Sequence, residues 1–324
     1  MTTRGKASAP AKIILFGEHF VVYGNTAILA AINRRITVDA RKTTEGKITI
    51  RSDIGITGQY SDTGFKMING GIRAKTALDP LHSAIKHVLS SRETGIEVDI
   101  SSAIPHGIGL GSSAAACVAT VAAVNSLFQK NPSRQKICNI AIESERMIHV
   151  NSSGADCYIS TFGGLMQYSK ADGFRKIQAK GTLPLVVAST MVRHSTGDLV
   201  ARVKRFKERD ESLFAALADQ AADLCTQAKA AIASGNRAKV GELMNENHAI
   251  LRKMGVSHYK ADDLTDICMK AGALGAKITG AGGGGAVIAL AADKQGSTKI
   301  AARAKAAGYE SFEVGIDRKG LLIG

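Results

Sequence analysis

The sequence of 324 residues contains no tryptophan, and aromatic residues make up only 5% of it. Proteins that bind single-stranded nucleic acids stack bases on aromatic side chains, and this chain has few of them. Lys and Arg nevertheless outnumber Asp and Glu by 42 to 28, which gives a formal net charge of +14. The densest basic segment, residues 202–209, has helical spacing and includes Glu208. The charge therefore indicates a basic surface or attraction of anionic small molecules, and we expect no nucleic-acid partner.

Cysteine is also scarce, and no two cysteines form a CxxC pair. The five cysteines lie among apolar residues at Cys117, Cys138, Cys157, Cys225 and Cys268. An odd, unclustered set argues against a disulfide framework or a structural zinc site. We therefore expect a protein of the reducing cytoplasm.

Long hydrophobic runs are missing as well. The longest apolar stretch, residues 114–128, is interrupted by Thr120, Asn125 and Ser126 and is too short to span a bilayer. No secretory signal precedes the first strand-like segment, so we expect no membrane association. A hydrophobic content of 45% over this length is enough for a large core, and the length favours two domains.

The first half of the chain is rich in strand signals. Apolar residues alternate with polar ones over 36–40, 48–50 and 96–100, and residues 12–16 form an apolar run, as is typical of strands. The pattern further predicts helices near 78–91, 112–128 and 134–149, a strand at 163–168 and a loop at 169–183.

The second half is dominated by helical periodicity, from about 198 to 273 with a break at 234–235. The remaining predicted elements are strands at 184–190, 277–279, 286–290 and 311–315 and a helix near 296–307. Strands in the first half and helices in the second indicate an α+β protein of two domains, with residues 1–180 and 181–324 as their bounds.

The most informative segment is IPHGIGLGSS, residues 104–113. Gly107, Gly109 and Gly111 allow tight turns and let the backbone approach a ligand that a Cβ would exclude. Ser112 or Ser113 can cap the helix that follows, whereas an uncapped helix start offers N–H groups to an anion. The segment is therefore either a plain capping loop or a cradle for nucleotide phosphates, and three glycines in five positions favour the cradle.

Three segments resemble, in order and spacing, the motifs of the GHMP kinases. These segments are PAKIILFGEHFVVYG (10–24), IPHGIGLGSSAA (104–115) and KITGAGGGG (277–285). Within that superfamily the resemblance is to the mevalonate kinases, because ERMIHVNSSGADCYISTFGG (145–164) is similar to one of their segments and GEH is not continued as in galactokinases. A single glycine-rich loop would be weak evidence, but four ordered motifs cover essentially the whole chain.

The resemblance implies a two-domain GHMP kinase fold. A mixed-sheet N-terminal domain (1–180) and a helix-rich, ferredoxin-like C-terminal domain (181–324) would enclose an active site in the cleft between them. It also implies a homodimer that uses ATP and Mg²⁺ to phosphorylate the 5-hydroxyl of mevalonate, an early step of isoprenoid synthesis. The alternatives are a sibling kinase acting on phosphomevalonate, homoserine or a sugar, a catalytically silent metabolite sensor, and a nucleic-acid-binding protein.

The nucleotide and metal sites follow from the same motifs. The expected nucleotide-binding residues are Pro105, His106, Gly107, Ile108, Gly109, Leu110, Gly111, Ser112 and Ser113. Mg²⁺ takes few protein ligands because it keeps waters and phosphate oxygens. The resemblance assigns these ligands to Ser113 and Glu145, although from the residues alone Glu143 is an equal candidate beside the same apolar stripe.

Asp156, in the turn-like loop SSGAD, is the candidate catalytic base. An aspartate in such a sequence is most often a turn or cap residue. The resemblance places Lys12 beside it, and Lys12 follows Pro10 and Ala11 at the start of an apolar strand, an unusual place for an unpartnered lysine. Its ammonium would keep the carboxylate ionised and stabilise charge on the transferring group.

The substrate-binding residues rest on the resemblance alone. They are Lys12, Glu18, His19, Thr196, Thr279 and Gly280, with Ser195 beside Thr196. His149 is expected to buttress the catalytic loop. Departures from the family pattern are Val150 for glycine, Ser152 for proline and Cys157 for asparagine, and they bear on substrate detail more than on activity.

Overall fold

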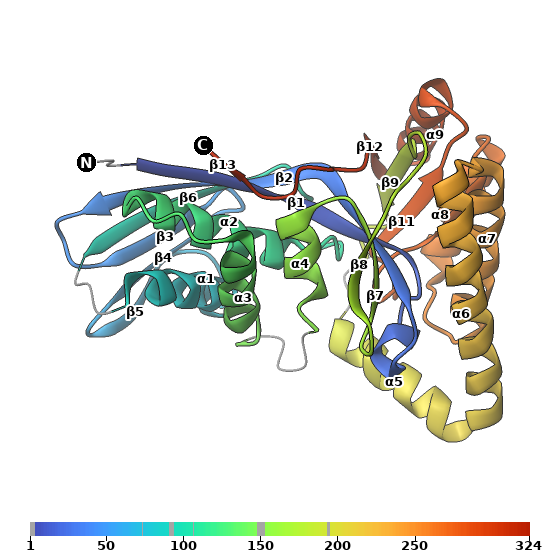
Figure 1. Cartoon of the computed structure of the whole chain (residues 1–324), viewed down its shortest axis with the longest axis horizontal. Coiled ribbons are helices and arrows are strands. Elements are labelled where there is room, and N and C mark those ends of the chain that lie inside the picture. The colour runs from blue at the N-terminus through green and yellow to red at the C-terminus, as the bar shows by residue number, and fades with distance from the viewer. Residues whose placement is uncertain (1–3, 73, 91–93, 106, 148–152, 193–194) are drawn as a thin grey trace.

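The structure is a computed structural model that describes residues 4–72, 74–90, 94–105, 107–147, 153–192 and 195–324. The expectations for His106, His149, Val150 and Ser152 therefore lie outside the described residues. The described residues form two β-sheets, and helices cover each of them. The two sheets lie side by side in Figure 1. The α+β architecture expected from the sequence is confirmed.

The first sheet is built on two long antiparallel strands, β1 (Arg4–Phe16) and β2 (Ala27–Thr43). Its path is completed by β6 (Gly95–Ser102), β3 (Ile48–Ser52), β4 (Ile56–Ser61), β5 (Gly64–Asn69) and β13 (Leu322–Ile323), in the order β13-β1-β2-β6-β3-β4-β5. Only β3 and β6 are parallel among these described pairs, so the sheet is mixed. The register of β1 shifts between Pro10 and Ala11, where proline cannot donate to the ladder.

Four helices accompany this sheet: α1 (Ala74–Leu89), α2 (Ser112–Leu127), α3 (Arg134–Glu145) and α4 (Ala155–Phe162). Helix α2 is the central one, and nearly all its residues are buried. Its alanines allow close approach to β1, where a Cβ on Gly5 would lie 2.1 Å from the Ala123 carbonyl oxygen. This packing fixes the start of α2 next to the middle of β1.

The second sheet is antiparallel, with the order β10-β11-β9-β12. Its strands are β9 (Leu185–Ser189), β10 (Gly275–Ile278), β11 (Ala286–Leu290) and β12 (Glu310–Val314). Its helices are α5 (Thr196–Arg209), α6 (Glu211–Ser234), α7 (Arg237–Lys253), α8 (Tyr259–Lys270) and α9 (Lys294–Ala306). No described helix is both long and apolar enough to cross a membrane. The domain division at residue 180 stays a prediction, and β13 returns from the second half of the chain to pair with β1.

Two local expectations were wrong. The segment 169–183, expected as a loop, contains the short strand β8 (Gly173–Ile177), which pairs with β7 (Leu165–Ser169) at the edge of the first sheet. Asp156, expected in a loop, lies in the first turn of α4, because the chain turns at Gly154 and the helix begins directly after it. The Ser and Gly residues before Asp156 favour a turn. The sequence did not indicate that a helix begins directly after Gly154.

The second sheet depends on one very close approach of helix and strand. A Cβ on Gly275 of β10 would lie 2.0 Å from the Gly241 backbone oxygen of α7, and backbone cannot yield as a side chain can. We predict that Gly275→Ala lowers the free energy of unfolding by about 1–3 kcal/mol, measured by urea denaturation. Gly71→Ala, where the added Cβ meets open space, should change it by less than about 0.5 kcal/mol. Equal midpoints for the two variants would show that the contact is unimportant.

Candidate active site

An ion pair between Lys12 and Asp156 joins the first strand to the start of α4. The Nζ and Oδ2 atoms are 3.3 Å apart, the lysine side chain is 7% exposed, and the carboxylate is 40% exposed. The ammonium is therefore held inside the protein, and the carboxylate faces outward beside it. The negative charge also lies in the first turn of a helix, where the helix dipole favours it.

The glycine loop lies directly against this pair. The backbone N–H of Lys12 donates to the Leu110 carbonyl oxygen at 2.9 Å. A Cβ on Gly111 would lie 2.8 Å from the Cγ of Lys12 and 3.6 Å from Oδ2 of Asp156. Gly111 also has a φ of 72°, in the left-handed region that favours glycine. Because the side chains of Ile108 and Leu110 are buried, the loop offers its backbone to a ligand.

Helix α2 begins at this loop without a side-chain cap. Its N-cap residue is Gly111, which is in a left-handed conformation and has no side chain to accept a hydrogen bond from the first turn. The suggestion that Ser112 or Ser113 caps the helix was wrong, because both lie inside its first turn. The N–H groups and positive dipole end of α2 are thus directed at the space beside Lys12 and Asp156, which suits an anion.

Ser113 and Glu145 form a second polar contact at the same helix start. The Ser113 hydroxyl donates to the carboxylate of Glu145, the buried last residue of α3. Burial and the neighbouring Glu145 carboxylate raise the pKa of the Cys117 thiol. Glu143, the alternative metal ligand considered from the sequence, is exposed, and its Oε2 lies 3.5 Å from Nε2 of His87 on the surface. A hydroxyl and a carboxylate are hard oxygen donors of the kind that bind Mg²⁺, so Ser113 and Glu145 fit a divalent cation.

The third glycine motif reaches the site from the second sheet. The Thr279 hydroxyl accepts from the Ile14 N–H and donates to the Ile14 carbonyl oxygen, both at 2.9 Å. A Cβ on Gly280 would lie 3.7 Å from the Gly109 carbonyl oxygen, so the two glycine-rich loops face each other. Thr279 and Gly280 are therefore brought to the predicted cleft.

His19 is held in an unusual conformation next to this motif. It is buried, its φ is 64°, and its Nε2 lies 2.9 Å from the Ala281 carbonyl oxygen. Because a carbonyl oxygen only accepts, Nε2 carries the proton and Nδ1 of the neutral ring is an acceptor. Burial lowers the pKa of His19, which favours this neutral form.

Glu18 does not fit its predicted contact with a substrate. Its carboxylate is fully buried and pairs with the ammonium of Lys277, while its second oxygen accepts from Asn247 at 3.2 Å. Both oxygens are therefore occupied inside the protein. The only signal in the sequence was Lys277 within the predicted strand 277–279, and it did not indicate a partner.

Thr196 is the first residue of α5, with Ser195 as its N-cap. The segment before it touches the third glycine motif, because the Gly285 N–H donates to the Val192 carbonyl oxygen at 3.3 Å. Within the described part of the chain, no hydrogen bond or ion pair joins Thr196 to Lys12 or Asp156. The role of Thr196 stays a prediction.

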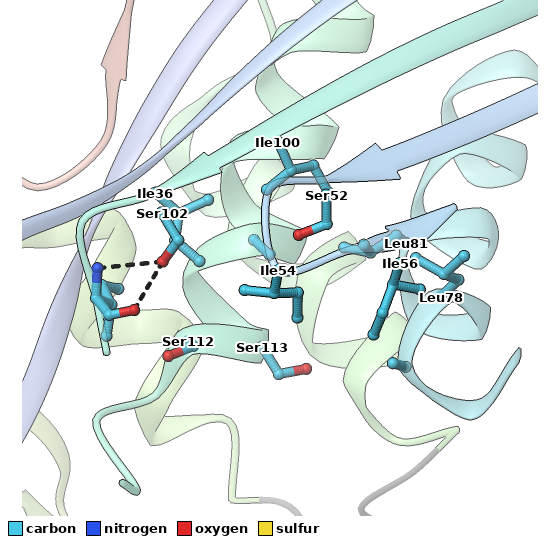
Figure 2. Close-up of a pocket in the computed structure, with 13 residues that line it drawn as sticks. Ile36, Ser52, Ile54, Ile56, Leu78, Leu81, Ile100, Ser102, Ser112 and Ser113 are labelled. Carbon is cyan, nitrogen blue, oxygen red and sulfur yellow. Dashed lines mark hydrogen bonds between the residues drawn. The ribbon is translucent and has the colours of Figure 1, made fainter. Parts of the chain in front are cut away.

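A cavity of about 240 Å³ adjoins the start of α2, and the sequence analysis missed it. Its walls come from β2, β3, β4, α1, β6 and α2 and from the loops after β3 and β6 (Figure 2). Aliphatic side chains and four serines line it: Ile36, Ser52, Ile54, Ile56, Ala77, Leu78, Leu81, Ile100, Ser102, Ile104, Ser112, Ser113 and Ala116. The residues are distant in sequence and unremarkable singly, so only the fold reveals the pocket.

Fold and site define a small-molecule kinase in which a glycine loop, an uncapped helix and a lysine–aspartate pair converge. Two family models match the chain: GHMP kinases N terminal domain at residues 75–164 and GHMP kinases C terminal at residues 228–310. Mevalonate kinases from Pyrococcus abyssi and Pyrococcus furiosus are each 39% identical to this chain, covering 98% of it and 97% of each relative. The chain belongs to the mevalonate kinase family of the GHMP kinases.

Solved structures of GHMP kinases resemble this chain over nearly its whole length. L. major mevalonate kinase in complex with R-mevalonate superposes with a TM-score of 0.84 at 29% identity, covering 97% of this chain and 96% of that one. Lactococcus lactis galactokinase complexed with galactose has a TM-score of 0.76 at 22% identity, covering 98% of this chain and 95% of that one. At that identity the second likeness concerns the fold alone.

The contact of Gly111 with Lys12 yields a test of the site. We predict that Gly111→Ala lowers kcat/KM about 100-fold, because the new Cβ displaces the Lys12 side chain. Gly46→Ala is the matched control, since Gly46 has a similar φ of 65° but open space around its Cβ. Steady-state kinetics of both variants should show a loss for position 111 only. Equal activities would mean that Lys12 tolerates displacement.

Proposed function

We propose that the protein transfers the γ-phosphoryl group of ATP to the 5-hydroxyl of mevalonate, in isoprenoid synthesis. The observation that carries this proposal is the Lys12–Asp156 pair lying against Gly111 at the uncapped start of α2. Phosphoryl transfer needs positioning and charge neutralisation more than covalent chemistry, and this arrangement supplies both. The full-length likeness to mevalonate kinases supports the choice of acceptor.

ATP would lie across the glycine loop and the adjoining cavity. The backbone N–H groups of residues 107–113 would hold the triphosphate, with the positive end of α2 behind it. The base would enter the aliphatic cavity, which borders Ser112 and Ser113 at the same helix start. Phosphate and base sites are therefore contiguous, as one nucleotide requires.

The acceptor would lie on the opposite side, at the exposed face of the Asp156 carboxylate. Asp156 would orient the 5-hydroxyl and accept its proton, while Lys12 stabilises the negative charge on the attacking oxygen and the transferring group. Neutral His19 would accept a hydrogen bond from an acceptor hydroxyl through Nδ1. Thr279 and Gly280 would close this side of the cleft.

Magnesium would be held by the Ser113 hydroxyl and the Glu145 carboxylate, which already lie in contact. When bound, the ion supplies neutralisation of the charge on the β- and γ-phosphates. The predicted homodimer and cytoplasmic location stay predictions, since a single chain tests neither.

The acceptor is tested by a coupled assay that follows ADP release with mevalonate, phosphomevalonate, homoserine and galactose. We expect kcat/KM to be highest with mevalonate, with 5-phosphomevalonate as the product. A higher kcat/KM with another acceptor would show that the protein is a related kinase with that acceptor as its substrate. No turnover with any of them would support a silent binding protein.

Removing either member of the catalytic pair tests the mechanism. We predict that Asp156→Asn lowers kcat about 10²- to 10⁴-fold, because the base is lost, and that Lys12→Met has a loss of similar order. Lys294→Met removes an exposed ion pair with Glu313 and should leave kcat unchanged. Circular dichroism should show all three variants folded. Near-normal turnover of both site variants would refute the proposed roles.

A further inference from the structure

A second charged pair, fully enclosed, joins the two sheets. Glu18 lies between β1 and the 3-10 helix Phe20–Tyr23, while Lys277 lies in β10, 259 positions away. Neither side chain has any exposed surface. Besides the carboxylate, the Lys277 ammonium donates to the Ile278 carbonyl oxygen at 2.7 Å, and Asn247 of α7 donates to Glu18. Each of the two charged groups therefore has two hydrogen-bond partners inside the protein.

Stability does not explain why the chain keeps this pair. Removing two charges from water carries a large desolvation penalty, and replacing such a pair with apolar residues of similar volume is often neutral or stabilising. Burial lowers the pKa of Lys277, and the Glu18 carboxylate opposes this change. Removing one partner alone leaves an uncompensated buried charge, whereas removing both leaves none.

The pair lies between the segments that carry the acceptor-side groups. Glu18 immediately precedes His19, whose positive φ is a strained conformation that the surrounding contacts must maintain. Lys277 is two residues before Thr279, which bonds to Ile14 of β1. The His19 ring in turn bonds to Ala281 of the third glycine motif. Three separate links thus tie β1 and the loop after it to β10 and the segment after it, and only the ion pair among the three is charged and fully buried.

We propose that Lys277 is a positioning residue for phosphoryl transfer, which acts through Glu18 to hold the His19 loop against the third glycine motif. The inference rests on the proposed function, because it assigns the pair to the acceptor side of that site. Neither Glu18 nor Lys277 has a described contact with the phosphate loop, whose own link to β1 is the Lys12–Leu110 hydrogen bond. Loss of the pair should therefore weaken use of the acceptor and spare use of ATP.

The decisive variant is the double substitution Glu18→Gln with Lys277→Met, which removes both charges at similar volume. We expect its urea midpoint to stay near that of the wild type, while KM for mevalonate rises about tenfold or more and kcat falls. KM for ATP should change less than about twofold. The double variant Lys294→Met with Glu313→Gln, which removes an exposed pair, should match the wild type throughout.

A double variant with both the stability and the mevalonate kinetics of the wild type would overturn the inference. The pair would then have no role in the reaction. Equal rises in both KM values would also overturn it. If the double variant does not fold, Asn247→Leu tests the same positioning role. It removes one hydrogen bond to Glu18 and keeps the ion pair. That variant should raise KM for mevalonate several-fold and spare KM for ATP. A wild type inactive on mevalonate would instead refute the proposed function.

Discussion

The buried ammonium of Lys12 beside the half-exposed carboxylate of Asp156 is the constraint on which the site depends. A lysine inside an apolar strand needs a partner, and the partner must come from another segment that reaches the strand at this point. Helix α4 provides it by starting after Gly154, where a Cβ would collide with Ile142 at 2.6 Å. The glycine loop must then pass the pair with no side chain at Gly111. Each feature is required by the one before it.

The two sheets divide the chemistry between them. The first carries the proposed nucleotide loop, the cavity beside it, the Ser113–Glu145 contact proposed to hold the cation, and the Lys12–Asp156 pair. The second brings its glycine motif across and fastens it to β1 through Thr279, and to the loop after β1 through Ala281 and Lys277. The geometry of the proposed acceptor side therefore depends on contacts between the sheets, whereas the proposed phosphate side is built mainly within one sheet and its helices.

Much of the candidate site could be predicted from sequence, because the glycine loop is a local pattern and the family resemblance supplied the distant residues. Three glycines before a serine pair and an alanine-rich helix indicate a phosphate loop, and the resemblance placed Lys12, Glu145 and Asp156 in one cleft. The fate of Glu18 could not be predicted, since its partner is 259 positions away and a lysine in an apolar strand does not name its counter-ion. The cavity could not be predicted for the same reason, because ordinary aliphatic residues and serines from six elements (β2, β3, β4, β6, α1 and α2) line it.

The most direct measurement is a crystal structure with a non-hydrolysable ATP analogue, Mg²⁺ and mevalonate. We predict that the acceptor 5-hydroxyl lies about 3 Å from the Asp156 carboxylate, with the Lys12 ammonium between it and a γ-phosphate bound at the start of α2. The cation should contact Ser113 and Glu145. A hydroxyl bound away from Asp156, or a triphosphate that does not touch residues 107–113, would contradict the account.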